Sequence, residues 1–275
     1  MTQSPIQQQT IQLVATQIPK TEKLEEMLTP FALDETLIRH LTKEEDDVPF
    51  VHFWTLEDIV ILGMTDTKVP YLEQGLERLR SNGFTPIVRQ AGGLAVVSNE
   101  GILNISLLFK NQQMPSINEA YAWMQQLIQA AFPEAEALGG IQAFEVADSY
   151  CPGDYDLSIQ KRKIAGIAQR RLKDVVCVSI YLSVYGDQNR RGLVVRDFYD
   201  HALQGEETKW HFPEVNADSM WNISDALGID LTIEDVQVRV LQALTKLGCT
   251  LEENETDFIH TPEFQKALER FVKRQ

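Results

Sequence analysis

The sequence predicts an α+β protein in which mixed or antiparallel sheets are packed with helices. Clusters of short apolar segments typical of strands alternate with segments of helical periodicity, without a regular β-α-β-α order. The chain has 275 residues, of which 44% are hydrophobic and 24% charged, the composition of a globular protein. It contains no repeat of fixed period and no low-complexity tract. We therefore expect one large domain with extensions.

The composition argues against several functional classes. With 40 acidic and 25 basic side chains the net charge is −15, whereas a general nucleic-acid binder needs clustered Lys and Arg. No apolar run approaches the ~18 residues that span a bilayer, and the N-terminus lacks the features of a signal peptide. The cysteines are too few for a disulfide framework in a chain this long. We expect a cytoplasmic protein that binds neither nucleic acid nor membranes.

The N-terminal third predicts an arm followed by strands and a helix. Residues 1–40 include a stretch rich in Gln and Thr, which predicts an N-terminal arm or a loosely attached element. Residues 44–47 predict an exposed acidic turn. The apolar and aromatic residues 50–63 predict two strands around a short polar turn. Residues 71–82 have helical spacing, and Gly83 is a typical stop for that helix.

A compact β region and a helix follow. Residues 85–110 contain apolar runs, and the turn Asn-Glu-Gly at 99–101 predicts a hairpin between two of them. Ser116 predicts a helix start, because Glu119 three residues later completes a capping box. We expect that helix to end near Pro133.

The second half predicts further strands and then helices. Residues 143–147 predict a short strand and residues 148–156 a turn-rich loop. The segments LSI, KIAGIAQ and VVCVSIYLSVYG predict three successive strands. Helical spacing follows at 225–227 and 233–247, and Thr261 predicts the N-cap of a last helix.

Cys151 is the candidate nucleophile. It lies in SYCPGDYD, a loop too polar to be core, and a reactive thiol must be partly exposed. Cys177 lies in an apolar run and is expected in the core, and Cys249 carries no motif. A nearby ammonium lowers the pKa of a thiol, and a strand at 157–159 with a tight turn can bring Lys163 back beside the loop. From the residues alone, a catalytic Cys151 and an inert loop cysteine both remain open.

Glycines provide a second candidate feature. Gly92 and Gly93 stand between two strands, where their backbone can approach a ligand closely and expose N–H groups. An ordinary bulge or turn has the same pattern. Gly166 is equally compatible with a bulge or a point of close approach. The five histidines are scattered without metal-ligand spacing, so we expect no metal site.

Two segments together resemble a known family. RQAGGLAVVSNEGILNISLLF resembles the R-x-x-GG-x-A-V…LN-x-S segment of the biotin/lipoate protein ligase and transferase family. Further along, DYDLSIQKRKIAGIAQRR is similar to that family's D-[LI]…K-[IV]-[SA]-G-x-[AS]-x-R element, in the same order and spacing. The resemblance covers roughly residues 45–250. It implies a catalytic domain of the biotin/lipoate ligase type at 41–250, with a C-terminal helix at 251–275 packed on it.

Within the family, SYCPGDYDLSI is similar to the octanoyl-[glycine cleavage H protein]:protein N-octanoyltransferases. That resemblance implies Cys151 as the acyl-thioester nucleophile and Lys163 as the residue that lowers its pKa. It also implies a set of substrate-binding residues, for the acyl tunnel and the reacting carbonyl: Arg89, Gly92, Gly93, Leu94, Asp156 and Gly166.

The implied activity is an amidotransferase reaction of protein lipoylation that requires no cofactor or metal. It moves an octanoyl group from octanoyl-lysine of the glycine cleavage H protein to a lysine of E2 lipoyl domains. Leu94 stands where ATP-dependent lipoate ligases usually carry a third glycine; its side chain would obstruct a nucleotide phosphate and could pack against an acyl chain. The alternatives are an ATP-dependent lipoate-protein ligase, an acyl-carrier-protein-dependent octanoyltransferase and a non-catalytic lipoyl-domain binding module.

The basic stretch from Lys161 to Lys173 contrasts with the acidic remainder of the chain. A solvated face is one interpretation of such a run. Because partners of this family are generally acidic around the acceptor lysine, the resemblance implies that Arg170, Arg171 and Lys173 dock them.

Overall fold

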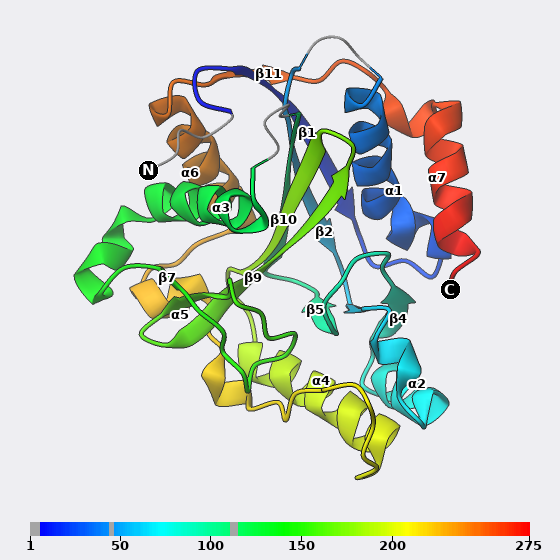
Figure 1. The fold of residues 1–275 in the computed structure, drawn as a ribbon. Helices are drawn as coiled ribbons and strands as arrows, with labels where there is room; N and C mark the ends of the chain where they lie inside the picture. Colours follow the sequence, from blue (N-terminus) through cyan, green and yellow to red (C-terminus); the bar gives the residue numbers. More distant parts are fainter. Residues whose placement is uncertain (1–5, 44–46, 111–114) are drawn as a thin grey trace.

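The computed structural model describes residues 6–43, 47–110 and 115–275, arranged around two sheets (Figure 1). The larger sheet has eight strands in the order β11-β1-β2-β6-β10-β9-β8-β7. Its strands are β1 (Thr10–Ile18), β2 (Phe50–Leu56), β6 (Ile102–Lys110), β7 (Gln142–Ala143), β8 (Leu157–Ile159), β9 (Arg162–Leu172), β10 (Val175–Ser183) and β11 (Thr250–Glu253). β1 is parallel to β2 and β11, and the other pairs are antiparallel. The mixed-sheet prediction is confirmed.

The smaller sheet has the order β4-β3-β5, formed by β3 (Ile59–Leu62), β4 (Thr85–Val88) and β5 (Val96–Ser98). The predicted hairpin around 99–101 is wrong, because β5 pairs with β3 whereas β6 pairs with β2 and β10. The turn therefore connects the two sheets. The buried Arg191 guanidinium holds it by donating to Asn99 Oδ1 at 2.7 Å and to the Glu100 carbonyl at 2.6 Å.

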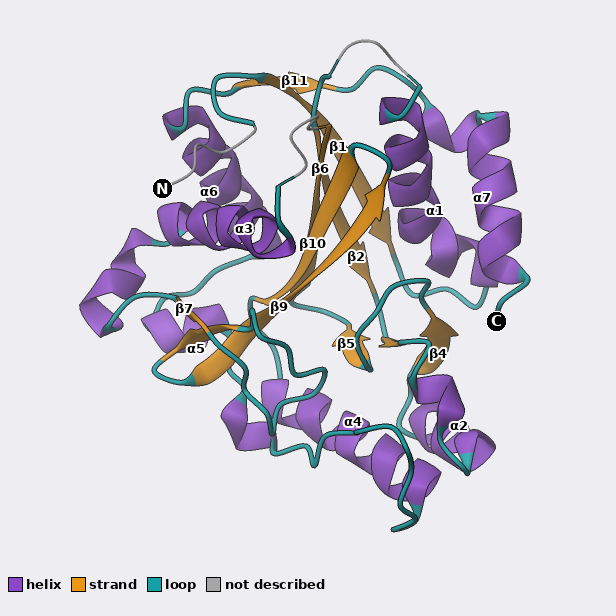
Figure 2. Ribbon diagram, viewed as in Figure 1, coloured by secondary structure: helices purple, strands orange, loops and turns teal. Residues whose placement is uncertain are grey.

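Helices cover both faces of the larger sheet (Figure 2). The helices are α1 (Leu24–Leu41), α2 (Leu72–Ser81), α3 (Ile117–Ala131), α4 (Gln188–Leu203), α5 (Ile223–Leu227), α6 (Ile233–Lys246) and α7 (Pro262–Val272). α1 and α7 pack together on one face, and α3 and α6 on the other. α2 and α4 pack on each other beside the smaller sheet. No described helix is long and apolar enough to cross a membrane.

Alternation along β10 divides the core into two parts. Val176, Val178 and Ile180 join the buried cluster on the α3/α6 face, whereas Cys177 and Tyr181 join the cluster on the α1 face. Successive side chains of a strand point to opposite faces, so this apolar run supplies both cores at once.

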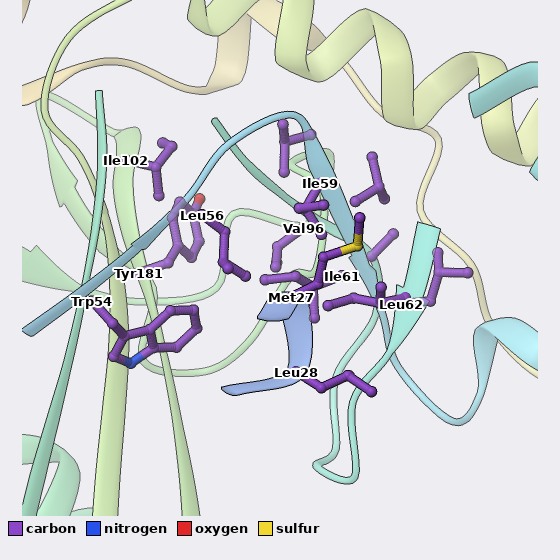
Figure 3. Close-up of a cluster of buried hydrophobic side chains, with 14 of the residues drawn as sticks. Met27, Leu28, Trp54, Leu56, Ile59, Ile61, Leu62, Val96, Ile102 and Tyr181 are labelled. Carbon is purple, nitrogen blue, oxygen red and sulfur yellow. The ribbon is translucent and has the colours of Figure 1, made fainter. Parts of the chain in front are cut away.

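Helix α1 links the two sheets. Figure 3 shows Met27 and Leu28 of α1 near Ile61 of β3, with Trp54 and Tyr181 of the larger sheet in the same cluster. Helix α1 therefore packs against side chains of both sheets.

The N-terminal segment differs from the arm that its composition predicts. β1 lies between β2 and β11 and pairs with Phe50–Leu56 over residues 12–18. α1 buries one side against the sheet and contains Pro30, a residue that disguises a helical pattern in sequence. The pairing partners of β1 lie far along the chain, so local composition carried no sign of them. The predicted acidic turn falls mostly on 44–46, outside the described residues.

Predictions that rest on local signals are largely confirmed. Gly83 follows α2 with φ 88°, and the capping box of Ser116 and Glu119 opens α3. The strand predicted at 143–147 is shorter, because β7 ends at Ala143 and the Val146 N–H donates to Asp156. Helix α4 was not predicted.

The signal for α4 lies in its cap and its apolar spacing. Asp187 accepts from the Arg190 N–H as N-cap, and the helix buries residues at 194, 195, 198, 199 and 202. Gly192 lowers helix propensity within it. That glycine is required by packing, since a Cβ there would lie 2.8 Å from Ala217.

Candidate functional site

A cavity of about 390 Å³ lies between α1 and the larger sheet. Its wall combines residues of α1, β2, β9 and β10 with two loops, one after β4 and one before β8. The loop after β4 contributes Arg89, Gly92 and Gly93, and the loop before β8 contributes Cys151 and Asp156. The tertiary structure thus brings together most of the residues that the sequence singled out.

The glycine loop is held by the Arg89 guanidinium. This buried group donates to the carbonyls of Gly92 at 3.0 Å, Leu94 at 2.8 Å and Ile61 at 3.1 Å. Gly93 has φ 85°, and a Cβ there would lie 2.9 Å from Cys151 Sγ and 2.7 Å from the guanidinium. Both the backbone conformation and the space therefore require glycine at 93.

The Cys151 thiol is half-buried and meets a backbone donor. The Leu94 N–H donates to Sγ over 3.1 Å, and Arg89 Nη2 lies 3.8 Å from Sγ. Cys151 itself has φ 47°, a left-handed conformation that is uncommon for a side-chain-bearing residue. The loop therefore directs this thiol at the glycine loop.

The tight turn expected before Lys163 is present. Gln160 and Lys161 have φ 49° and 67°, so the turn between β8 and β9 has positive φ at both central residues. Ser158 pairs with Lys163 across it. The hairpin brings Lys163 back beside the loop that carries Cys151.

The Lys163 side chain donates hydrogen bonds to oxygen atoms of that loop. Its fully buried Nζ donates to the carbonyls of Cys151 at 2.8 Å and Tyr150 at 2.9 Å and to Ser149 Oγ at 3.2 Å. It forms an ion pair with Asp156 at 2.9 Å. Lys163 thus contacts Cys151 at its backbone carbonyl, and a carboxylate balances its charge.

Asp156 closes the loop from the other side. Its Oδ2 accepts from the N–H groups of Gly153 at 3.2 Å and Val146 at 3.3 Å. Burial raises the pKa of this carboxyl, while Lys163 acts in the opposite direction. A buried charge pair with satisfied hydrogen bonds fixes the geometry of its surroundings.

Gly166 is a point of close approach. It pairs with Tyr181 in regular register, and a Cβ at Gly166 would lie 2.9 Å from the Tyr181 ring and 3.5 Å from Lys163 Cε. The bulge interpretation is therefore wrong at this position. The glycine leaves room for the aromatic ring beside the cavity.

Leu94 enters the site through its backbone. Its N–H meets the thiol and its carbonyl accepts from Arg89. Leu94 is absent from the described residues that line the cavity. The expected packing of its side chain on an acyl chain therefore gains no support from the lining.

The basic stretch does not form one patch. Arg170 lines the cavity and pairs with Glu35 at 2.5 Å, whereas Arg171 donates to the Pro115 carbonyl at 2.6 Å on the other face of β9. Lys173 is exposed in the β9–β10 turn. At roughly 3.3 Å per residue, that turn lies about 23 Å along the strand from Gly166.

Sequence reasoning missed the residues that surround Lys163. The Tyr150 and Tyr181 rings lie 5.8 Å apart, and Nζ lies 6.0 Å and 5.9 Å from their centres. Tyr150 is adjacent to Cys151 in sequence, which was the available signal, whereas Tyr181 arrives by strand pairing. Across the described residues no group of three or more His, Cys, Asp and Glu could hold a metal ion.

The chain matches a family of known proteins over most of its length. Residues 26–245 match the family described as the lipoyl protein ligase A/B catalytic domain. The chain is similar to proteins named octanoyl-[GcvH]:protein N-octanoyltransferase. One from Oceanobacillus iheyensis is 40% identical over 90% of this chain and 88% of that protein. One from Lysinibacillus sphaericus is 44% identical over 80% and 79%.

Solved structures share the fold. A putative lipoate protein ligase from T. acidophilum with bound lipoic acid has a TM-score of 0.66 and 19% identity, covering 96% of this chain and 95% of that one. Lipoate-protein ligase A bound with ATP has a TM-score of 0.66 and 18% identity, covering 98% and 95%.

Proposed function

Because the chain belongs to the lipoyl protein ligase A/B catalytic domain family, we propose that it is an octanoyltransferase that works through a Cys151 thioester. In this proposal the octanoyl group comes from a lysine of GcvH and passes to a lysine of an E2 lipoyl domain. The name of these relatives, octanoyl-[GcvH]:protein N-octanoyltransferase, supports the donor and the acyl group.

The observation that carries the thioester is the contact between the Leu94 N–H and Cys151 Sγ, 3.1 Å long, at the wall of the cavity. A backbone donor directed at a nucleophile also lies near the oxygen of a carbonyl that this nucleophile attacks. The cavity provides apolar surface for an acyl chain attached to that carbonyl.

In the first half-reaction the Cys151 thiolate attacks the octanoyl amide carbonyl and forms a tetrahedral intermediate. The carbon–nitrogen bond then breaks, and the donor lysine leaves as an amine that carries the proton lost by the thiol. The acyl group remains on Sγ as a thioester. The Leu94 N–H stabilises the oxyanion of the intermediate.

In the second half-reaction the amine of the acceptor lysine attacks the thioester. The carbon–sulfur bond breaks, an amide forms, and the proton from the amine returns to the thiolate. One amide is exchanged for another, so the reaction needs no nucleotide to drive it.

Lys163 serves this chemistry in two ways. Its hydrogen bonds to the carbonyls of Tyr150 and Cys151 support a fixed position of the thiol loop. Its ion pair with Asp156, whose carboxylate accepts from the Gly153 and Val146 N–H groups, supports the same loop at a second point.

Partner docking by the basic stretch rests on Lys173. Arg170 and Arg171 are engaged in contacts within the protein. Arg170 forms an ion pair with Glu35 at the cavity wall, and Arg171 donates to the Pro115 carbonyl just before α3. An exposed lysine in the β9–β10 turn, about 23 Å along the strand from Gly166, acts on the encounter with an acidic partner.

Intact-mass spectrometry after mixing with octanoylated GcvH tests the proposal. An octanoyl adduct is expected on the wild type and on Cys249→Ser, a buried cysteine outside the cavity lining, and no adduct on Cys151→Ser. An unchanged adduct on Cys151→Ser contradicts the assignment. Activity that requires free lipoate and ATP, or an acylated carrier protein, would replace it by one of the alternatives.

A further inference from the structure

A buried carboxyl group behind the glycine loop has no role in the transfer steps. Asp66 lies in the turn that follows β3 and is fully buried. Its Oδ2 accepts from the Gly63 N–H at 2.7 Å, and its Oδ1 accepts from the Tyr199 hydroxyl of α4 at 2.8 Å. Burying an ionisable side chain costs free energy unless hydrogen bonds satisfy it, and these two donors do so.

Tyr199 extends this contact to the glycine loop. Its hydroxyl accepts from the Ala95 N–H at 3.3 Å. The carbonyl of the same peptide unit, that of Leu94, accepts from Arg89 at 2.8 Å. Because a peptide unit is planar and rigid, donors and acceptors at both ends fix its orientation.

The preceding peptide unit is supported as well. A Cβ on Gly63 would lie 1.9 Å from the Gly93 carbonyl oxygen, so the turn and the glycine loop pack backbone on backbone. The other end of that peptide unit is the Leu94 N–H, which points at Cys151 Sγ. Two consecutive peptide units therefore hold the thiol's donor, and the Asp66 turn supports both.

We propose that Asp66 and Tyr199 are a positioning pair that sets the direction of the Leu94 N–H towards the thiolate and the oxyanion. The pair touches neither substrate nor thiol; it acts through the backbone between residues 93 and 95. This inference rests on the proposed function for its catalytic consequence, because an oxyanion donor is effective only when it is held in place before the reaction.

The Asp66 carboxyl is ionised at neutral pH although burial disfavours its charged form. Burial raises the pKa of Asp66 to about 6, opposed by the hydrogen bonds from Tyr199 and Gly63 and by the nearby Arg89 charge. Above that pH both oxygens are available as acceptors for the two donors that meet them.

Tyr199→Phe is the decisive variant, because it keeps the ring and its contacts with Phe198 and Phe212 while removing the hydroxyl. Tyr71→Phe is the matched control, since Tyr71 makes a tyrosine–carboxylate contact with Glu206 at the surface. We expect the single-turnover rate constant for acylation by octanoylated GcvH to fall about tenfold in Tyr199→Phe, with KM for the donor unchanged within twofold. Tyr71→Phe should match the wild type.

A second measurement is independent of the acyl donor. The rate of Cys151 alkylation by iodoacetamide at pH 7 should fall about threefold in Tyr199→Phe, because a misdirected Leu94 N–H no longer fixes the position of Sγ. Asp66→Asn, whose amide cannot accept from both donors, should act in the same direction. Unchanged acylation and alkylation in a folded Tyr199→Phe overturn the inference. Reduced alkylation in Tyr199→Phe with no acylation of the wild type supports the pair and contradicts the proposed function.

Discussion

Cys151 and Cys177 line the same cavity, yet they occupy opposite environments. Cys151 lies in a loop, is half-buried and receives the Leu94 N–H. Cys177 lies within β10, and burial, followed by the nearby Asp34 carboxylate, raises the pKa of its thiol far above the ordinary value. Both thiols line the cavity, so the proposed nucleophile differs from Cys177 by its partial exposure and by the loop that supplies a backbone donor.

Exchanging each thiol for a hydroxyl tests this comparison most strongly. Cys151→Ser is expected to lower turnover by about 10³-fold or more, because the hydroxyl is a far weaker nucleophile. Cys177→Ser should still form the octanoyl adduct, as seen by intact-mass spectrometry. An adduct that depends on Cys177 would reverse the comparison.

Lys163→Met removes the cation that holds the thiol loop. It leaves the buried Asp156 without its partner, so we expect a loss of about 3–5 kcal/mol in the free energy of unfolding by urea titration. The rate of Cys151 acylation by octanoylated GcvH should also fall, because the thiol loop loses the hydrogen bonds that hold it. Lys161→Met, in the exposed turn of the same hairpin, is the control and should change neither quantity. Equal stability of the two variants would contradict the role of the ion pair.

Asp66 makes stability depend on pH in a definite direction. Its pKa in the folded state is about 6, raised from 3.8, so between these values the folded protein binds more protons than the unfolded chain. Its contribution to stability is present below the unfolded pKa and is lost as pH rises through the folded pKa. The free energy of unfolding of the wild type, relative to Asp66→Asn, should fall by about 2 kcal/mol from pH 4 to pH 7. A difference that is constant across this range would show that Asp66 does not titrate as its burial implies.

Comparing alanine substitutions at two glycines with similar φ angles distinguishes backbone strain from steric crowding of the Cys151 thiol. Gly93 and Gly83 have φ 85° and 88°, but a Cβ meets Cys151 Sγ and Arg89 at the first and nothing within 4 Å at the second. Each change to Ala should cost about 1 kcal/mol of stability from the backbone. Acylation should fall, by roughly tenfold, in Gly93→Ala alone. A matching decline in Gly83→Ala would assign the effect to general destabilisation.

The smallest effect is expected far from the thiol. Lys173→Glu should raise KM for octanoylated GcvH by about twofold to threefold at low salt, and the difference should disappear in high salt because the contact is screened. The rate of thioester formation from a small acyl donor should remain unchanged. A salt-independent change in KM would argue against docking at the β9–β10 turn.

Parts of the site follow from local signals and were predictable. The turn at Gln160 and Lys161 returns the chain within a few residues, so the approach of Lys163 to the Cys151 loop could be inferred from spacing. Which atoms of Lys163 and the loop are in contact could not be inferred from spacing. The Nζ of Lys163 is surrounded by Ser149, Tyr150 and Asp156 of the Cys151 loop, and by Tyr181, which strand pairing brings in from β10.

The sequence by itself determined the α+β class, the caps at Ser116 and Thr261, the tight turn before Lys163, and the motif segments that contain the glycine loop, Cys151 and Lys163. These depend on interactions within a few residues, which composition and spacing reveal. Only the tertiary structure decided that β1 belongs to the larger sheet and that β5 pairs with β3 rather than with β6. It also decided that Tyr199 and Asp66 form a hydrogen bond beside the glycine loop. Such contacts join residues far apart in the chain, and their partners are selected by packing of the whole core rather than by local preference.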